Sequence, residues 1–209
     1  GFTLIAGMSF FTDSRESDIS AILMVVLIIG VLTIFVSKRL NPMAWKKLLN
    51  RKDYEKLMAG EEKVNNKLSE LDDSYFIFCN FIFELFHVDH LIVSENGFFL
   101  IGRVPYNEEL NVVNNTLFAG DNSLETLTSR LWRVCHLLNI IIRKGFNELE
   151  VMPVPVLVVP EAVQVSISEF NGIAVTTLDN LNTIIKKLKF KVPAQEAEGF
   201  AVYLKQRYM

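Results

Sequence analysis

Residues 88–104 read VDHLIVSENGFFLIGRV, two apolar runs separated by a short polar break. Residues 91–93 and 98–101 are rich in β-branched and aromatic side chains, which favour β-strands. Glu95, Asn96 and Gly97 lie between them, and an Asn-Gly pair adopts the left-handed backbone that tight hairpin turns require. The stretch therefore predicts two antiparallel strands joined by a short turn.

Patterns on either side of this hairpin predict the other elements of the domain. Before it, helical spacing predicts an amphipathic helix over residues 53–71, hinged near Gly60, and aromatic density predicts a strand over residues 75–86. After it we expect a polar loop over 105–121, a helix from Asn122 or Ser123 to about Lys144, a strand over 154–159, a short strand over 173–176, and helices over 178–188 and 194–208.

The fold class follows from this order of elements. A continuous apolar run at residues 154–159 is typical of a central strand that is buried on both faces. Helix, three strands, helix and strand give the order αβββαβ, an α/β sandwich around a mixed central sheet. In the helix that starts near residue 122, Leu131 and Leu138 belong to the predicted core stripe, while Arg130, Arg133 and Arg143 are expected to face outward.

Composition limits the chemistry of the chain. Its 209 residues are 50% hydrophobic, enough for a core, and its net charge of -3 gives no overall basic bias toward nucleic acid or an anionic membrane. Cys79 and Cys135 lie far apart in apolar stretches and are expected to be reduced core residues. The three histidines lack metal-ligand spacing, so the sequence predicts no metal and no cofactor.

A long apolar run precedes the domain. Residues 19–36 carry no charge, and as a helix rising roughly 1.5 Å per residue they would cover about 27 Å, close to the hydrocarbon thickness of a bilayer. Acidic residues dominate before the run and basic residues after it, and the charge order is the reverse of that in a cleaved signal peptide. The sequence predicts a retained transmembrane helix; the alternative is a buried helix of a soluble domain.

The positive-inside rule gives the expected domain organisation. Residues 1–18 are predicted outside the cytoplasm, 19–37 as the transmembrane helix, 38–52 as a basic juxtamembrane linker and 53–209 as the cytoplasmic domain. This corresponds to a single-pass protein of the inner (plasma) membrane. Residues 1–7 precede a plausible start at Met8 and are left out of the fold prediction.

Three short motifs, in the expected elements, resemble the nuclease-related domain (NERD) family of the PD-(D/E)xK nuclease superfamily. The family's first helix carries Gly-Glu followed by an aliphatic residue, its second strand an aliphatic-Asp-His segment, and the next turn Asn-Gly. The matching residues here are Gly60-Glu61 with Val64, Val88-Asp89-His90, and Asn96-Gly97. The resemblance spans roughly residues 60–181 and implies a restriction-endonuclease-like αβββαβ fold.

The residues that carry the family's reaction are replaced. In active relatives, a Glu-x-Lys on the third strand completes an acidic Mg²⁺ site, and the next helix supplies a Gln. Here the register puts Gly102 at the Glu position, Val104 at the Lys position and Thr126 at the Gln position. Glu61 and Asp89 remain, and two carboxylates alone make a poor site for a hard cation. No catalytic residue is therefore expected, and Mg²⁺ is implied only if activity persists.

Other residues are poorly placed to fill these positions. Glu95 lies in the hairpin turn, while Glu108 and Glu109 follow a proline-containing loop whose course the sequence does not define. Strand alternation places Arg103 on the face opposite Gly102 and Val104.

The sequence thus favours a membrane-anchored, catalytically inactive nuclease-like scaffold whose partners are the membrane and the protein subunits of a secretion or conjugation assembly. One alternative is a membrane-tethered metal-dependent nuclease. Another is DNA binding without cleavage, through the lysine cluster Lys186, Lys187, Lys189 and Lys191. A solvated, basic helix end explains the same lysines without any ligand.

Overall fold

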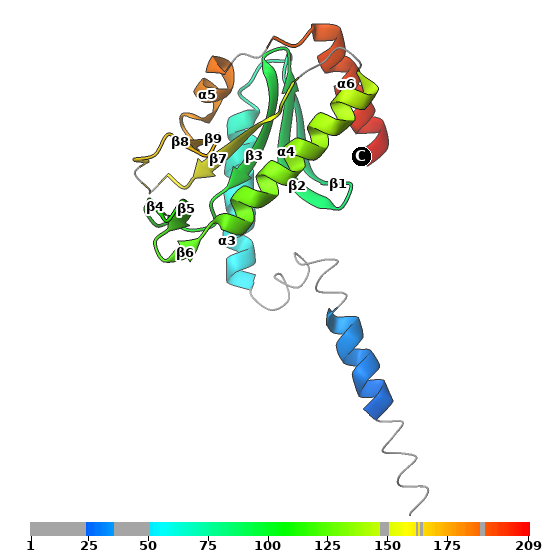
Figure 1. Ribbon diagram of the computed structural model, residues 1–209, viewed down its shortest axis with the longest axis vertical. Helices are drawn as coiled ribbons and strands as arrows, with labels where there is room; N and C mark the ends of the chain where they lie inside the picture. The colour runs from blue at the N-terminus through cyan, green and yellow to red at the C-terminus, as the bar shows by residue number, and fades with distance from the viewer. Residues whose placement is uncertain (1–23, 36–50, 147–150, 162, 164, 189–190) are drawn as a thin grey trace, which may run out of the picture. The chain divides into compact units, whose positions relative to one another are not determined.

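The computed structural model describes residues 24–35, 51–146, 151–161, 163, 165–188 and 191–209. The chain divides into two compact units, Gly1–Lys56 and Leu57–Met209. A helix covers residues 24–35 of the first unit. The second unit is an α/β domain in which helices cover both faces of a central sheet (Figure 1).

The elements of the domain follow one another with short connections. The first half contains α3 (Arg51–Leu68), β1 (Phe76–Phe83), β2 (Phe86–Ser94), β3 (Gly97–Arg103), β4 (Leu110–Val113), β5 (Thr116–Ala119) and β6 (Asn122–Ser123). The second half contains α4 (Glu125–Gly145), β7 (Val154–Val159), β8 (Glu169–Phe170), β9 (Ile173–Thr177), α5 (Leu181–Lys187) and α6 (Ala194–Tyr208).

The main sheet is mixed, with strand order β1-β2-β3-β7-β9-β8. β1, β2 and β3 are antiparallel neighbours, whereas β3, β7 and β9 run parallel. The crossover that the parallel pair β3 and β7 requires runs through the segment from β4 to β6 and then through α4. The αβββαβ order and the mixed central sheet predicted from the sequence are confirmed.

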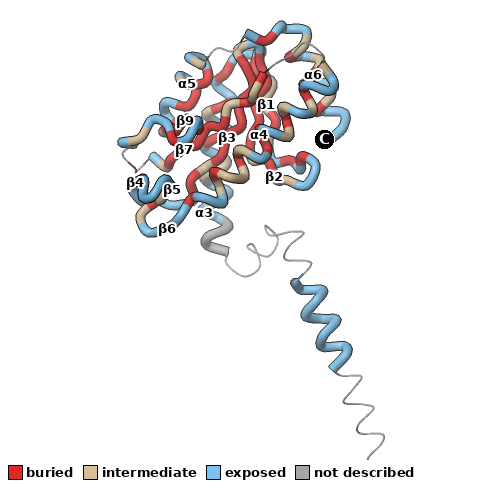
Figure 2. The backbone as a smooth tube through the Cα atoms, in the orientation of Figure 1, coloured by how far each residue is buried: buried red, intermediate tan, exposed pale blue. Residues whose placement is uncertain are grey.

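The sheet separates two apolar cores (Figure 2). On one face, strand residues such as Phe98 and Leu100 pack with α4 and α6. On the other, Phe99 and Ile101 pack with α3 and α5. Alternate residues of β3 therefore enter opposite cores, which explains why its run of apolar residues is unbroken.

Several boundaries differ from the prediction. The strand predicted over residues 75–86 ends at Phe83, because a tight turn at Glu84 and Leu85 reverses the chain into β2. Glu84 has a positive φ of 54° there, a conformation that the sequence does not predict because it is uncommon for glutamate. α3 runs through Gly60 as one helix, so the predicted hinge is wrong.

The loop predicted over residues 105–121 contains most of a second sheet. β4, β5 and β6 form a small antiparallel sheet, and the β4–β5 turn has positive φ at Asn114 and Asn115. Asn122 and Ser123 form β6 and do not cap α4, whose N-cap is Leu124. The Ser123 hydroxyl still accepts a hydrogen bond from the Glu125 N–H, at 3.3 Å.

Only part of the predicted transmembrane segment lies within the described residues. Among them, no helix is both long and apolar enough to cross a membrane. The described helix covers residues 24–35, and the rest of the predicted span, with most of the basic linker, lies outside the described residues. The structure therefore does not show a transmembrane helix, and this helix stays a prediction.

Candidate functional site

Five charged or titratable side chains from four elements form a cluster that we call the Asp89 cluster. Its members are Glu61 on α3, His87 and Asp89 on β2, Arg103 at the end of β3, and Arg130 on α4. Two of them, Glu61 and Asp89, are the remnant residues predicted from the sequence. The fold thus brings together carboxylates that lie 28 positions apart (89 − 61 = 28) in the chain.

Both oxygens of the Asp89 carboxylate are engaged by neighbouring side chains. His87 Nε2 lies 3.2 Å from Asp89 Oδ1, and Arg130 Nη2 lies 3.4 Å from Asp89 Oδ2. Burial raises the pKa of Asp89, but the hydrogen bond from His87 and the charge of Arg130 outweigh it, so the pKa lies below its ordinary value of 3.8. Asp89 is therefore held as a carboxylate by a protein cation.

Glu61 has a different environment. Burial and the nearby charge of Asp89 raise the pKa of Glu61 above 4.5, although Arg103 and His87 offset part of this shift. Its side chain is thus easier to protonate than an exposed glutamate. The pKa values of Glu61 and Asp89 are therefore shifted in opposite directions. Neighbouring acids often differ in this way when their environments differ.

Arg103 lies against α3 at Gly60. An added Cβ at Gly60 would be 2.1 Å from Arg103 Nη1, so the guanidinium would have to move to make room for a larger residue. Arg103 Nη2 donates a hydrogen bond to the Leu57 carbonyl at 3.1 Å. Burial lowers the pKa of Arg103, while Glu61 and Asp89 raise it in opposition. The Gly60-Glu61 motif thus accommodates a cation from β3.

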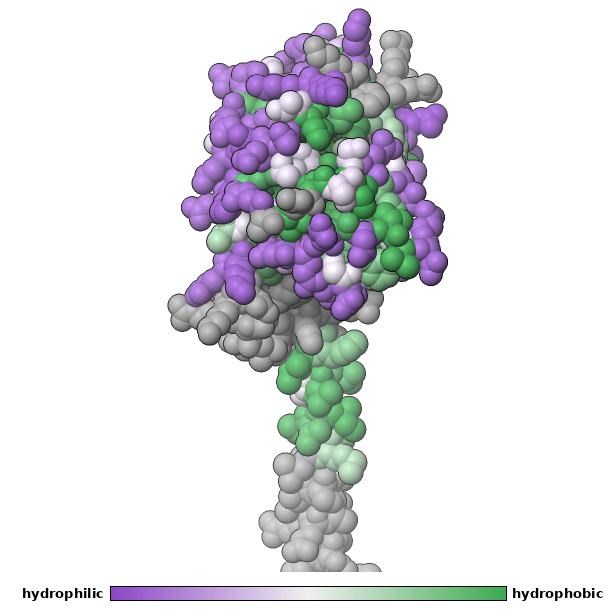
Figure 3. Space-filling view, turned by 90° about the vertical axis from the view of Figure 1, so that its left-hand side faces the viewer, coloured by the Kyte–Doolittle hydropathy of each residue, from purple (hydrophilic) through white to green (hydrophobic). Residues whose placement is uncertain are grey.

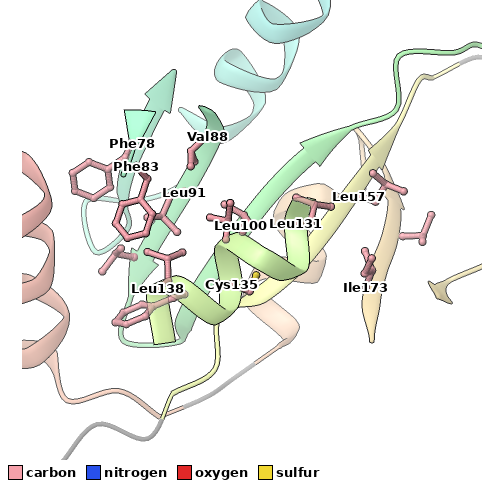
Figure 4. Packing of buried hydrophobic residues seen from close by; sticks show 14 of the residues in the cluster. Phe78, Phe83, Val88, Leu91, Leu100, Leu131, Cys135, Leu138, Leu157 and Ile173 are labelled. Carbon is pink, nitrogen blue, oxygen red and sulfur yellow. The ribbon is translucent and has the colours of Figure 1, made fainter. Parts of the chain in front are cut away.

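The two positions expected to carry Glu-x-Lys are filled by apolar packing. Gly102 lies beneath Leu131 of α4, whose Cδ2 would be 3.0 Å from an added Cβ. Val104 is fully buried in the core between the sheet and α4. Figure 4 shows Leu131 and Leu138 reaching from α4 toward the strands that carry Leu100 and Leu157. Arg103 lies on the opposite face, as strand alternation predicts.

Thr126, the third replaced position, is exposed on the first turn of α4. The buried threonine of that turn is Thr128, whose hydroxyl donates to the Leu124 and Glu125 carbonyls. The hydrogen-bonding capacity of the buried Thr128 hydroxyl is therefore used within the first turn of α4.

Sequence reasoning missed the two side chains that contact Asp89. Arg130 was expected to face outward, but it is half-exposed and reaches Asp89. His87 was not assigned a role and contacts Asp89 from two residues away on the same strand. The available signal was the spacing of Arg130 one position before the core residue Leu131, which places it at the border of the buried stripe.

Two further features surround the cluster. His90 is buried, and its Nε2 lies 2.7 Å from Asn65 Oδ1 on α3. Burial lowers the pKa of His90 to about 4, so it is neutral at neutral pH. Asn80, with φ of 51°, lies across from Asp89 between the Cys79–His90 and Phe81–Val88 strand pairs.

The other predicted residues lie elsewhere in the domain. Lys186 and Lys187 are exposed on the last turn of α5, and Lys191 is exposed just before α6. Lys189 lies outside the described residues. Glu108 packs against Gly120 in the small sheet, and Glu95 remains in the β2–β3 turn. Cys79 and Cys135 are free thiols, and Cys135 is a core residue as predicted, whereas Cys79 is half-buried and belongs to neither core.

The residues present do not fit the Mg²⁺ ion that the nuclease resemblance implies. Asp89 already contacts Arg130 and His87, and no carboxylate stands at Gly102 or Val104. In the described part of the chain, no three His, Cys, Asp or Glu side chains are arranged to hold a metal ion. A site for a hard cation needs several oxygen ligands, which Glu61 alone does not add.

The mixed αβββαβ domain, with Glu61 on α3 near Asp89 on β2, is the arrangement expected of a nuclease-like fold. Residues 56–111 match the family model described as nuclease-related domain, NERD, so this segment is similar to that family. The match covers less than half of the chain and includes Glu61, Asp89, Gly102 and Val104. Neither the comparison with curated proteins nor that with solved structures gave a match.

Proposed function

We propose that this chain is a membrane-anchored, catalytically inactive nuclease-like protein that serves as a scaffold in a membrane assembly such as a secretion or conjugation machine. One observation carries the loss of catalysis: Arg130 pairs with Asp89 while Leu131, the next residue, covers Gly102. A protein cation and an apolar side chain thus take the space in which active relatives are expected to bind metal and substrate.

The proposed anchor is the apolar run over residues 19–36, with the domain on the cytoplasmic side. All residues of the described helix 24–35 are exposed, and its surface is apolar (Figure 3). Such a surface is costly in water and favourable in a bilayer. These features support anchoring, and a scaffold role would follow from a fold that is kept without its catalytic residues.

A nuclease assay tests the loss of catalysis. Purified full-length protein, in mild detergent, is incubated with linear and single-stranded DNA and Mg²⁺ or Mn²⁺, beside an Asp89→Ala variant. We expect no cleavage above background from either protein. Cleavage that Asp89→Ala abolishes would establish the alternative, a tethered metal-dependent nuclease. Salt-dependent DNA binding that Lys186→Glu/Lys187→Glu weakens would establish the DNA-binding alternative.

Extraction of membranes at alkaline pH tests the anchor. The wild-type chain should stay with the membrane, whereas Leu27→Lys/Leu32→Lys should release it, because two central charges oppose insertion by about 5 kcal/mol or more. Leu85→Lys is the matched control, since Leu85 is a 93% exposed apolar residue of the domain. Release of the wild-type chain would refute anchoring. Isolation of a lone protein after gentle solubilisation would refute the scaffold role.

A further inference from the structure

β1 is an unusual edge strand. It forms one end of the six-stranded sheet (Figure 1). It runs for eight residues, Phe76–Phe83, and contains no charged residue and no proline. Within the described residues, β1 makes backbone hydrogen bonds to β2 and to no other segment. Its outer edge therefore has no backbone partner among these residues. Natural proteins usually protect such edges with charges, prolines or bulges, because a free edge binds another strand.

The sequence of β1 is nearly a palindrome. It reads Phe-Ile-Phe-Cys-Asn-Phe-Ile-Phe, so the residues on either side of the Cys79–Asn80 midpoint repeat in reverse order. Two antiparallel copies related by a two-fold axis at this midpoint would place like residues opposite each other. Ile77 of one copy would face Ile82 of the other, and Phe78 would face Phe81.

The backbone of β1 supports the same symmetry. In a regular strand, residues 78 and 81 would point to opposite faces, because side chains alternate. Here Asn80 has a positive φ of 51°, and Phe78, Phe81 and Phe83 all lie in the core on the α4 and α6 side, with Phe76 packed against it. Ile77 instead packs with the core on the α3 side. The conformation of Asn80 thus gathers the four phenylalanines on one face.

The exposure of its side chains indicates that the other face of β1 is not fully covered by the rest of the domain. Ile82 is 62% exposed although it belongs to an apolar strand, and Cys79 is only half-buried. Opposite residues of an antiparallel pair have their Cβ atoms about 5 Å apart, so Ile77 of a second copy would cover Ile82. An uncharged strand also brings no like charges together in such a pair.

We propose that β1 is the interface for a second copy of this chain. Two β1 strands pair antiparallel about a two-fold axis between Cys79 and Asn80, and the two six-stranded sheets join into one continuous sheet. The pairing goes beyond the proposed function, since it requires neither the membrane anchor nor the loss of catalysis.

Cysteine cross-linking tests the register of this pairing. In full-length protein carrying Cys79→Ser, the double variant Ile77→Cys/Ile82→Cys should form a covalent dimer on mild oxidation or with a short bis-maleimide. Neither single variant should do so, because residue 77 faces residue 82 and not its own equivalent. Ile77→Cys/Val112→Cys is the matched control, since Val112 is an exposed apolar residue of β4.

Measurement of mass tests the interface itself. Sedimentation of the full chain in detergent should give two chains of 23.8 kDa per particle, and Ile82→Lys should shift the particle to one chain. Val112→Lys, at a residue 46% exposed, should leave the dimer intact. Far-UV circular dichroism checks that each variant is folded. A monomeric wild-type chain, or equal cross-linking in the single and double variants, would overturn the proposal.

Discussion

At the scale of single residues, the Asp89 cluster shows how the fold balances the charge of a buried carboxylate. Asp89 keeps its place on β2, but its negative charge is balanced by Arg130 at 3.4 Å. A buried carboxylate without a counter-charge would be costly, so Asp89 needs a neighbouring cation. Arg130 supplies that cation from α4.

Restoring the expected Glu-x-Lys should damage the fold before it restores a reaction. Gly102→Glu must displace Leu131, and Val104→Lys buries an unpaired charge at a fully buried position. We expect the double variant to lose about 3 kcal/mol or more of unfolding free energy and to remain inactive with Mg²⁺. Thermal unfolding in detergent measures the loss. Thr126→Gln, at an exposed position, should change stability by less than about 0.5 kcal/mol. A stable double variant that cleaves DNA would contradict this prediction.

The buried His90 should make stability depend on pH. Its pKa of about 4 in the folded chain lies below the ordinary 6.5, so between these values the unfolded chain binds more protons. The stability associated with neutral His90 is therefore fully present above pH 6.5 and is lost as the pH falls toward 4, by about 3 kcal/mol. Glu61 opposes this trend, because its raised pKa favours the folded state at lower pH.

Comparison of variants isolates the contribution of His90. His90→Gln keeps a donor for Asn65 Oδ1 but cannot gain a charge, so its stability should fall less than that of wild type between pH 6.5 and 4. His136→Gln, at an exposed position of α4, should follow the wild-type curve. Denaturant titrations at several pH values measure the difference. Parallel curves for wild type and His90→Gln would refute the assignment.

At the scale of elements, α3 combines a helix pattern with one glycine that the helix itself does not need. Glycine costs a helix interior roughly 1 kcal/mol relative to alanine, yet α3 is unbroken at Gly60. The physical reason is Arg103, whose guanidinium fills the space beside Gly60 and reaches the Leu57 carbonyl. The sequence indicated a hinge because glycine has a low helix propensity, and the contact with Arg103 is not visible in the sequence around Gly60.

A double-mutant cycle tests this reason. Gly60→Ala should destabilise the wild-type chain by about 1 kcal/mol or more, because Arg103 must leave its carbonyl and the carboxylates around it. In an Arg103→Ala background the same substitution should stabilise by about 0.5–1 kcal/mol, through helix propensity alone. Thermal unfolding measures both. Equal effects of Gly60→Ala in the two backgrounds would show that the two residues do not interact.

The elements that the sequence predicts best have strong local patterns. The apolar run of β7 and the Asn96-Gly97 turn lie where expected, and the residues after Pro193 form α6 with the predicted bounds. The β4–β5–β6 sheet was missed because its strands are at most four residues long and exposed on one side. A short, half-polar strand has little periodic signal, and its identity depends on its neighbour.

At the scale of the whole domain, one sheet separates two cores and should couple them. Leu68 on the α3 side and Leu138 on the α4 side are both buried, and each touches strands of the same sheet. We expect Leu68→Ala and Leu138→Ala each to lower the unfolding free energy by about 2–5 kcal/mol. Both should lower the midpoint of a single transition, because neither core persists without the shared strands.

Two probes test this coupling. In a Trp45→Phe background, the fluorescence of Trp132 reports on the α4 side, and far-UV circular dichroism reports on all elements. The two denaturation curves should coincide in wild type and in both leucine variants. Separate transitions in either variant would show that the two helical layers unfold independently.

The sequence by itself determined the order of the main elements, the buried centre of the sheet and the resemblance carried by Glu61, Asp89 and Asn96-Gly97. These features follow from periodicity, turn chemistry and motif spacing, which are local along the chain. Only the tertiary structure paired Arg130 with Asp89, placed Leu131 over Gly102 and left β1 as a bare edge beside β2. These features depend on how helices and strands pack against one another. The spacing of residues within one helix or strand does not show which side chain of another element each residue contacts.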